Sequence, residues 1–470
     1  MSEQQIAVPD AVHALLRRLE QNGFEAWAVG GCVRDLLSGY TPHDWDLCTA
    51  ATPQEMLQCF AGLQLIETGL QHGTLTVLLE GQPYEVTSYR VDGDYQDGRH
   101  PDQVQFVRKI EMDLSRRDFT INAMAWHPAR GLLDPFGGQR DLAGGIIRCV
   151  GSPRLRFEED ALRILRALRF ATVFGFSLEP GTEQAVLDEK EGLRRISPER
   201  IREEFFKLLC GAHAVEVLRR YLPVLAVVLP ELAPMAGFEQ KNPHHDKDVW
   251  GHAVAAVAAT DPDDLTLRLA ALLHDVGKPY CFTEDENGIG HFYGHAAKSA
   301  EVAQALLQRL HASGTLCRET VELVRLHDLL PDPQPRWVRR WLARLGPVQL
   351  NRLIELKRAD VTAQDPAFWA DRLDRIAQSR ELLSRLMREE GQLSIAKLAV
   401  NGEDLLALGV PQGPRIGALL HELLEKVLEG QLANEREPLL ATLRQEIETK
   451  AEVDPPAFAQ KTAYTNMGSE

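Results

Sequence analysis

The chain has 470 residues, of which 44% are hydrophobic and 26% charged, a composition typical of a soluble globular protein with room for three or four structural units. It has no run of about eighteen apolar residues, and its N-terminus lacks a basic segment followed by an apolar core, so we expect a cytoplasmic protein without a membrane partner. A formal net charge of -16 excludes bulk electrostatic attraction to nucleic acid, so any polyanion must be met by local clusters of arginine.

The first chemically distinctive stretch begins with a predicted buried strand at residues 26–29. Gly30 and Gly31 then open a turn into a short helix, whose first backbone N–H groups would face an anion bound above the glycines. A second predicted strand holds Asp44 and Asp46, whose side chains should converge because residues two apart in a strand point to one face. Two such carboxylates can hold a pair of Mg²⁺ ions. The stretch therefore predicts a phosphate-binding turn beside a metal site.

Two strands with alternating polarity are predicted at residues 73–79 and 84–89. Glu85 could lie beside the two aspartates as a third carboxylate on an adjacent strand. The polar, glycine-bearing segment 91–103 has no periodicity, so we interpret it as a mobile loop.

A helix is predicted at residues 113–125, with Arg117, Asp118 and Asn122 among its polar positions. Asp118 and Asn122 are four residues apart and would share one helix face. Asn122 could hold a sugar hydroxyl while an arginine meets phosphate.

A second and strongly helical pattern covers residues 154–174, with Glu159, Asp160 and Arg163 on its polar side. A carboxylate accepts hydrogen bonds and a guanidinium donates them. The Watson–Crick edges of cytosine and adenine share one donor and acceptor order, whereas uracil and guanine present the reverse. An Asp–Arg pair one turn apart could therefore admit CTP and ATP, because a wrong base leaves buried polar groups unpaired at a cost of about 1–3 kcal/mol each.

These segments carry a resemblance to a known family. The sequences GGCVRD, HDWDLCT, SRRDFTINAMA and FEEDALRILRALRFA are similar to successive motifs of bacterial class II tRNA nucleotidyltransferases, the CCA-adding enzymes of the polymerase β superfamily. The similarity extends to about Met235 and resumes more weakly over residues 398–440.

The resemblance implies an α+β fold with a polymerase β-like nucleotidyltransferase head, a small mixed sheet with helices, followed by an all-α neck, an HD domain and a body/tail. We expect the head at 1–149, the neck with its base-recognition helix at 150–235 and the HD phosphohydrolase-like domain at 236–335. A helical body/tail for tRNA binding should follow at 336–450, and a disordered C-terminal tail at 451–470.

The resemblance also implies residue roles. Asp44 and Asp46 would be catalytic Mg²⁺ ligands, with Glu85 as a third catalytic carboxylate. The implied nucleotide-binding residues are Gly30, Gly31, Arg34, Arg117, Asp118, Asn122, Glu159, Asp160, Arg163 and Arg166. Segment 91–103 is similar to the flexible element that the family needs for adding the terminal A.

A histidine-rich insert after about residue 242 resembles an HD phosphohydrolase domain. An HDxGK sequence, with a histidine 22 residues upstream and a second HD pair 53 residues downstream, carries this resemblance. Imidazole and carboxylate ligands suit Ni²⁺, Mn²⁺ or Fe²⁺ better than Mg²⁺. The implied ligands are His252, His274, Asp275 and Asp328, while His295 and His327 could hold a second ion. A degenerate, metal-free HD cluster is the alternative.

The sequence thus favours a template-independent nucleotidyltransferase that adds or repairs the 3′ CCA of tRNA with CTP and ATP. A bacterial poly(A) polymerase and an enzyme that adds only the terminal A remain alternatives, as does a phosphohydrolase whose head has become a nucleotide sensor. The sequence leaves the oligomeric state open.

Overall fold

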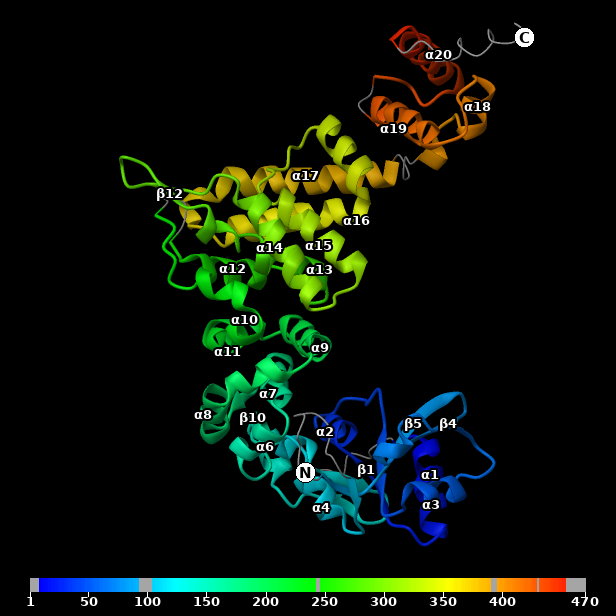
Figure 1. Ribbon diagram of the computed structural model, residues 1–470, viewed down its shortest axis with the longest axis vertical. Coiled ribbons are helices and arrows are strands. Elements are labelled where there is room, and N and C mark those ends of the chain that lie inside the picture. The colour runs from blue at the N-terminus through cyan, green and yellow to red at the C-terminus, as the bar shows by residue number, and fades with distance from the viewer. Residues whose placement is uncertain (1–7, 93–103, 242–245, 390–394, 429–430, 454–470) are drawn as a thin grey trace, which may run out of the picture. The chain divides into compact units, whose positions relative to one another are not determined.

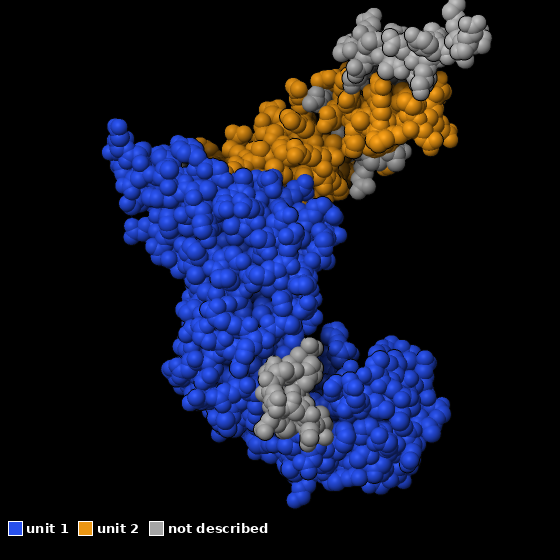
Figure 2. All heavy atoms as spheres, in the orientation of Figure 1, with its two compact units in different colours: residues 1–325 blue, residues 326–470 orange. Residues whose placement is uncertain are grey.

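The structure is a computed structural model that describes residues 8–92, 104–241, 246–389, 395–428 and 431–453. The chain divides into two compact units, residues 1–325 and 326–470, which Figure 2 colours separately. None of the helices in the described ranges combines the length and hydrophobicity needed to cross a membrane.

The first unit begins with a mixed sheet of strand order β3-β4-β5-β2-β1-β8-β9 (Figure 1). Its strands are β1 (Ala26–Val29), β2 (Asp46–Thr49), β3 (Gln64–Ile66), β4 (Thr74–Leu79), β5 (Gln82–Ser88), β8 (Ala125–His127) and β9 (Gly131–Leu133). Strands β2 and β5 run parallel, and the other neighbours run antiparallel. The prediction of a small mixed sheet in an α+β fold is confirmed.

Both faces of this sheet are covered, which explains why every residue of β1 is buried. On one face, helix α1 (Asp10–Gln21) packs against the sheet. Its Leu15, Leu16 and Leu19 share a hydrophobic cluster with Ala28 of β1 and Leu47 of β2. On the other face, Trp27 and Val29 pack in a second cluster that includes residues of helix α4 (Ile110–Ser115). The alternation of side chains along a strand sorts these residues between the two cores.

Shorter elements complete this part of the chain. They are α2 (Gly31–Leu37), α3 (Pro53–Cys59), η1 (Leu70–His72), β6 (Arg90–Asp92), β7 (Val104–Phe106), η2 (Thr120–Asn122), α5 (Gly138–Ala143), β10 (Ile146–Ile147) and β11 (Ser177–Leu178). The predicted loop 91–103 starts within β6, and its residues from 93 onward lie outside the described ones.

Helices follow the sheet within the first unit. They are α6 (Pro153–Glu159), α7 (Leu162–Phe174), α8 (Pro180–Asp188), η3 (Lys190–Arg195), α9 (Pro198–Leu209), α10 (Ala214–Arg220), α11 (Leu222–Val228), η4 (Pro230–Met235), α12 (Val249–Ala258), α13 (Leu265–Leu273), η5 (Lys278–Tyr280), α14 (His295–Arg309) and α15 (Gly314–Leu326). A small ribbon of β12 (Thr283–Glu284) and β13 (Gly290–His291) lies between η5 and α14.

The second unit is helical, as expected. It contains α16 (Pro335–Thr362), η6 (Pro366–Phe368), α17 (Ala370–Glu389), η7 (Ile395–Lys397), α18 (Gly402–Ala407), α19 (Pro414–Leu428) and α20 (Arg436–Val453). Helix α16 kinks at Gly346, which has φ 74° and precedes Pro347. The tail expected at 451–470 overlaps the end of α20 and otherwise lies outside the described residues. The domain boundaries drawn from the sequence stay predictions.

Two predicted helices are wrong in detail. Residues 113–125 are not one helix, because α4 ends at Ser115 and is followed by η2 and β8. Thr120 N donates to Arg148 O at 2.9 Å and Gly30 N to Met124 O at 3.2 Å, so pairing with distant strands replaces the helical hydrogen bonds. The helix predicted at 154–174 is broken at Asp160, which has an extended φ of -148° between α6 and α7.

Candidate active site

A cavity of about 510 Å³ lies in the first unit where the sheet meets α6, α7 and α9. Most of the residues that the sequence implicates in nucleotide binding line it. The lining residues are Gly30, Gly31, Arg34, Asp46, Arg116, Arg117, Asp118, Asn122, Asp160, Leu162, Arg163, Arg166, Arg169, Phe170 and Arg200. Seven arginines against three aspartates leave a positive surplus that suits a polyphosphate, although the whole chain is acidic.

The glycine turn brings the backbone close to these arginines. Gly30 precedes α2 with φ 80° and ψ -129°, a conformation that favours glycine. A Cβ atom at this position would lie 3.0 Å from Arg117 Nη1. The Gly30 N–H donates to Met124 O, so it is not one of the free donors expected at the helix start. The turn therefore contributes chiefly a close approach of the backbone.

Of the three predicted catalytic carboxylates, Asp46 lines the cavity, whereas Asp44 and Glu85 do not. Asp44 precedes β2 and Asp46 begins it, and both side chains are exposed while Trp45 between them is buried. Strands β2 and β5 place Glu85 directly beside Asp46 in parallel register. The exposure pattern and the position of Glu85 agree with the expected arrangement, but Asp44 lies before β2 and not in the predicted strand, and the catalytic roles stay predictions.

These three carboxylates concentrate negative charge. Among the residues that the structure describes, none makes a hydrogen bond or ion pair with the carboxylates of Asp44, Asp46 or Glu85, although the Cys32 thiol approaches the backbone oxygen of Asp46 at 3.9 Å. Loss of hydration raises the pKa of Asp46, the charge of Glu85 raises it further, Arg117 opposes them, and Asp44 adds a smaller increase. No lysine or arginine among the described residues forms an ion pair with these three carboxylates. Their oxygens therefore suit a divalent ion such as Mg²⁺.

Asp118 accepts hydrogen bonds from two other residues that line the cavity, Arg166 and Asn122. Its Oδ2 accepts a hydrogen bond from Arg166 Nε at 2.8 Å and forms an ion pair with Arg166 Nη2 at 2.6 Å, and its Oδ1 accepts from Asn122 Nδ2 at 3.1 Å. Asn122 Oδ1 accepts in turn from Arg34 Nη1 at 2.7 Å. Burial raises the pKa of Asp118, but Arg166 and then Asn122 outweigh it and hold the pKa at about 2. The expected neighbourhood of Asp118 and Asn122 is thus present without the expected helix.

The base-reading residues lie at the break between α6 and α7. Asp160 Oδ1 accepts from Leu162 N at 3.1 Å, and its Oδ2 lies 2.7 Å from Arg200 Nη2. Arg163 Nη1 instead donates to Glu159 Oε2 at 2.7 Å. Asp160 and Arg163 both line the cavity, but each is held by its own partner rather than by the other. Glu159 supports Arg163 from outside the lining.

Sequence reasoning missed Arg169, Arg200 and Glu204. Arg169 lies three residues after Arg166, a spacing that puts both on one face of α7 and could have revealed it. Glu204 is buried on α9, where its Oε2 lies 2.9 Å from Arg169 Nε. Glu204 and Arg200 come from a helix about forty residues further along, and no local pattern connects them to the cavity.

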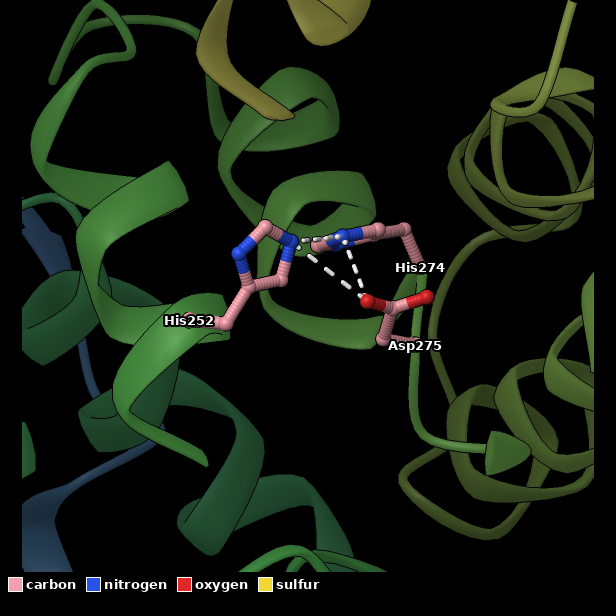
Figure 3. A group of neighbouring side chains, drawn as sticks. All are labelled: His252, His274 and Asp275. Carbon is pink, nitrogen blue, oxygen red and sulfur yellow. Dashed lines mark hydrogen bonds and ion pairs between the residues drawn. The ribbon is translucent and has the colours of Figure 1, made fainter. Parts of the chain in front are cut away.

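A second cluster lies later in the first unit. His252 comes from α12, while His274 and Asp275 directly follow α13, and Figure 3 shows the three side chains pointing toward one another. The two Nε2 atoms are 3.1 Å apart, and Asp275 Oδ2 lies 3.4 Å from that of His252 and 3.2 Å from that of His274. All three side chains are buried.

Neighbouring groups orient this cluster. His274 Nδ1 lies 2.8 Å from Ala271 O, and His295 Nδ1 lies 2.9 Å from Phe292 O. Donation to these carbonyls leaves each Nε2 as an acceptor, and that of His295 lies 3.3 Å from Asp275 Oδ1. Burial raises the pKa of Asp275, but His274 and Lys278 outweigh it, so the pKa lies well below its ordinary value.

Acceptors that face one another in a buried site fit a bound cation. Two ligands about 2.1 Å from one ion lie about 3.0 to 3.4 Å apart, close to the separations seen here. Lys278 Nζ, 2.7 Å from Asp275 Oδ2, adds a positive charge beside the cluster. His327 and Asp328, the remaining residues implied by the HD resemblance, belong to the second unit and stay predictions.

Comparison with known proteins adds to this geometry. Residues 26–148 match a family model described as the poly A polymerase head domain. Residues 175–235 match a probable RNA- and SrmB-binding site of polymerase A, and residues 295–443 match a putative tRNA nucleotidyltransferase domain 2.

Relatives match nearly the whole chain. A CCA-adding enzyme from Lactobacillus delbrueckii subsp. bulgaricus is 35% identical over 421 residues, which are 89% of this chain and 93% of the relative. One from Geobacillus stearothermophilus is 34% identical over 93% of this chain and 96% of its own. The crystal structure of the Bacillus stearothermophilus CCA-adding enzyme in complex with CTP has a TM-score of 0.69 and 30% identity, covering 95% of this chain and 100% of that one. The chain belongs to the CCA-adding enzyme family.

Proposed function

We propose that this protein builds or repairs the 3′-terminal CCA of tRNA with CTP and ATP, by nucleotidyl transfer without a nucleic acid template. The observation that carries the proposal is a single cavity lined by a glycine turn, a carboxylate of the predicted catalytic set, an arginine cluster and the two predicted base-reading side chains. Membership of the CCA-adding enzyme family supports the same reaction.

The arginines bind and orient the nucleotide in this proposal. Arg117 lies over the glycine turn, where it can meet the triphosphate, and Arg166 is held against Asp118 in a fixed direction. Asn122 is fixed between Asp118 and Arg34 and can receive the sugar. Because these side chains are already paired, little rearrangement is needed when the nucleotide enters.

Base selection follows from Asp160 and Arg163. Arg200 and the Leu162 N–H hold the Asp160 carboxylate, which accepts from the exocyclic amine of cytosine or adenine. Glu159 holds Arg163, which donates to the adjacent ring nitrogen. Uracil and guanine would place an acceptor against Asp160 and a donor against Arg163, and this arrangement excludes UTP and GTP.

Asp44, Asp46 and Glu85 would hold Mg²⁺. When bound, such ions activate the attacking 3′ hydroxyl and neutralise charge on the pyrophosphate leaving group. The protein would keep the acidic oxygens together beside the phosphate-binding arginines. The register of β2 and β5 does this for Asp46 and Glu85.

A primer assay tests the proposal. The full-length protein is incubated with tRNA ending one, two or three nucleotides short, with each nucleoside triphosphate alone and with CTP and ATP together. Incorporation of C and then A, with arrest after the terminal A, supports CCA addition. A long A tail would instead identify a poly(A) polymerase, and incorporation of A alone onto tRNA already ending in CC would identify an A-adding enzyme.

The double variant Asp44→Ala/Asp46→Ala tests the metal assignment. It should abolish incorporation while leaving the protein folded, because both side chains are exposed and make no described pairing. Incorporation that survives in this variant contradicts the assignment. A wild-type protein that binds CTP without incorporating it would favour a nucleotide-sensing head attached to a phosphohydrolase.

We also propose that the cluster of His252, His274 and Asp275 is the metal site of an HD phosphohydrolase-like domain. The convergence of imidazole and carboxylate acceptors supports a transition metal such as Ni²⁺, Mn²⁺ or Fe²⁺. When bound, such an ion supplies activation of water for attack on a phosphate ester. Lys278 would bind the phosphate.

Metal content tests this second proposal. The full-length protein is loaded with each metal, desalted and measured by elemental analysis. His252→Ala should lose most of the bound transition metal and retain CTP incorporation. His291→Ala, which removes a partly exposed histidine paired with Asp285, is the matched control and should keep the metal. If His252→Ala and His291→Ala hold the same amount of metal, His252 is not a metal ligand, and the cluster would be a metal-free remnant.

A further inference from the structure

Asp113 is a buried carboxylate that pairs with two arginines of the cavity, Arg116 and Arg117. Asp113 lies on α4 with 1% of its surface exposed, and it does not line the cavity. Its Oδ1 lies 3.0 Å from Arg116 Nε and 2.7 Å from Arg116 Nη2, and its Oδ2 lies 3.1 Å from Arg117 Nη2. The Arg90 N–H, from β6, approaches Oδ1 at 3.4 Å. One carboxylate therefore holds two consecutive guanidinium groups.

Both of these arginines line the cavity. Arg117 approaches the Gly30 turn, and its charge lowers the pKa of Asp46, so it lies near both the turn and this carboxylate. The backbone carbonyl of Arg116 accepts from Arg163 Nη2 at 3.2 Å, which ties the same short segment to α7. The positions of the two guanidinium groups thus bear on the part of the cavity where a triphosphate would lie.

Two adjacent guanidinium groups repel one another, and without a shared anion each would turn toward solvent. Burial raises the pKa of Asp113, whereas Arg117 and Arg116 lower it more strongly, so the carboxyl is ionised. A buried carboxylate contributes little net stability when its desolvation is counted, and its main effect is to specify the direction of its partners.

We propose that Asp113 is a positioning residue for the triphosphate, because its carboxylate aims Arg116 and Arg117 into the cavity. The inference rests on the proposed nucleotidyl transfer. Every nucleoside triphosphate carries the same phosphates, so Asp113 acts on CTP and ATP alike. It leaves the choice of base to Asp160 and Arg163.

The test compares full-length Asp113→Asn with full-length Asp141→Asn. Asp141 is an equally buried carboxylate that pairs with Arg148, which does not line the cavity. Asp113→Asn should raise KM for CTP and ATP by the same factor, about tenfold or more, the size expected when a carboxylate behind a ligand-binding side chain is lost. Its kcat should change much less, and discrimination against UTP should stay as in the wild type. Asp141→Asn should keep the wild-type KM.

A double-variant cycle separates positioning from a general structural effect. If Asp113 acts through Arg117, Asp113→Asn should raise KM much less in an Arg117→Met background than in the wild type. If Asp113→Asn fails to fold, Asp113→Ser replaces it, since a smaller side chain leaves room for water between the two arginines. Unchanged KM, fully additive effects, or altered base discrimination would each overturn the inference. A wild-type protein that incorporates no CTP would instead overturn the proposed function.

Discussion

Asp118→Asn is the most informative single substitution, because it removes one charge from the centre of the cavity and keeps the side-chain shape. The retained amide oxygen can still accept from Phe119 N and Asn122 Nδ2. The new amide nitrogen, however, faces the Arg166 donors that now bind Oδ2. The variant therefore tests the ion pair while it preserves the local hydrogen bonds.

The size of the effect follows from the pKa. Asp118 has a pKa of about 2 in the folded protein, compared with an ordinary value of 3.8. This difference corresponds to about 2.5 kcal/mol of folding free energy at neutral pH. In a unit of 325 residues the loss should lower Tm by roughly 3 to 5 °C. Displacement of Arg166 should also lower kcat/KM for CTP.

The pH dependence has a definite sign. Because the folded pKa is depressed, the stabilisation is fully present above the ordinary pKa of 3.8 and is lost as pH falls through about 2. Thermal denaturation of the full-length variant and wild type should therefore show a constant Tm gap between pH 7 and 5 that narrows below about pH 4.

The exposed Asp188, which accepts only from Gln184 among the described residues, provides the control, and Asp188→Asn should leave Tm unchanged. Equal Tm values for Asp118→Asn and wild type at pH 7, or a gap that widens on acidification, would refute the reasoning.

Three further substitutions, at Gly30, Asp160 and Arg163, test other parts of the cavity. Gly30→Ala should raise KM for CTP by about tenfold, because a Cβ would strain the left-handed backbone and press on Arg117, and steady-state incorporation measures it. Gly39→Ala, at the same φ of 80° with open space around it, should leave KM unchanged, so equal KM values for the two variants would contradict the contact. Asp160→Ala or Arg163→Ala should admit UTP or GTP, or lower the use of CTP and ATP together. Competition assays with mixed nucleotides measure this, and unchanged discrimination would argue against these two residues as the base-reading pair.

Strand periodicity was sufficient to predict the edge of the site that carries the carboxylates. Alternation predicted Asp44 and Asp46 outward and Trp45 inward, and their exposure agrees, although Asp44 lies in a bend before β2 and not in the predicted strand. The pairing of Glu85 with Asp46 was also anticipated, because two predicted strands followed in order. Alternation of this kind depends only on backbone geometry and on one buried face, so it can be read locally.

The helical spacing of apolar residues predicted helices less reliably where segments far along the chain bind the same backbone N–H and C=O groups. Residues 113–125 have helical spacing, yet Phe119 bridges to Cys149 and Val150 N donates to Asp118 O at 3.1 Å. Asp160 interrupts another apparently continuous helix, where its carboxylate caps the next helix and binds Arg200. In both places hydrogen bonds to residues far along the chain outweigh a weak local propensity.

The amino-acid sequence alone determined the chemical groups of the site, their order along the chain and the faces on which strand residues lie. Tertiary structure decided which charges meet: Asp160 with Arg200, Arg169 with Glu204, and Asp118 with Arg166. These partners are about 35 to 50 residues apart in the chain. The first two pairings depend on how α7 and α9 pack, and the third depends on how α7 meets the segment before η2. Local spacing predicts contacts within a helix or strand, whereas an ion pair between elements exists only once the chain has brought them together.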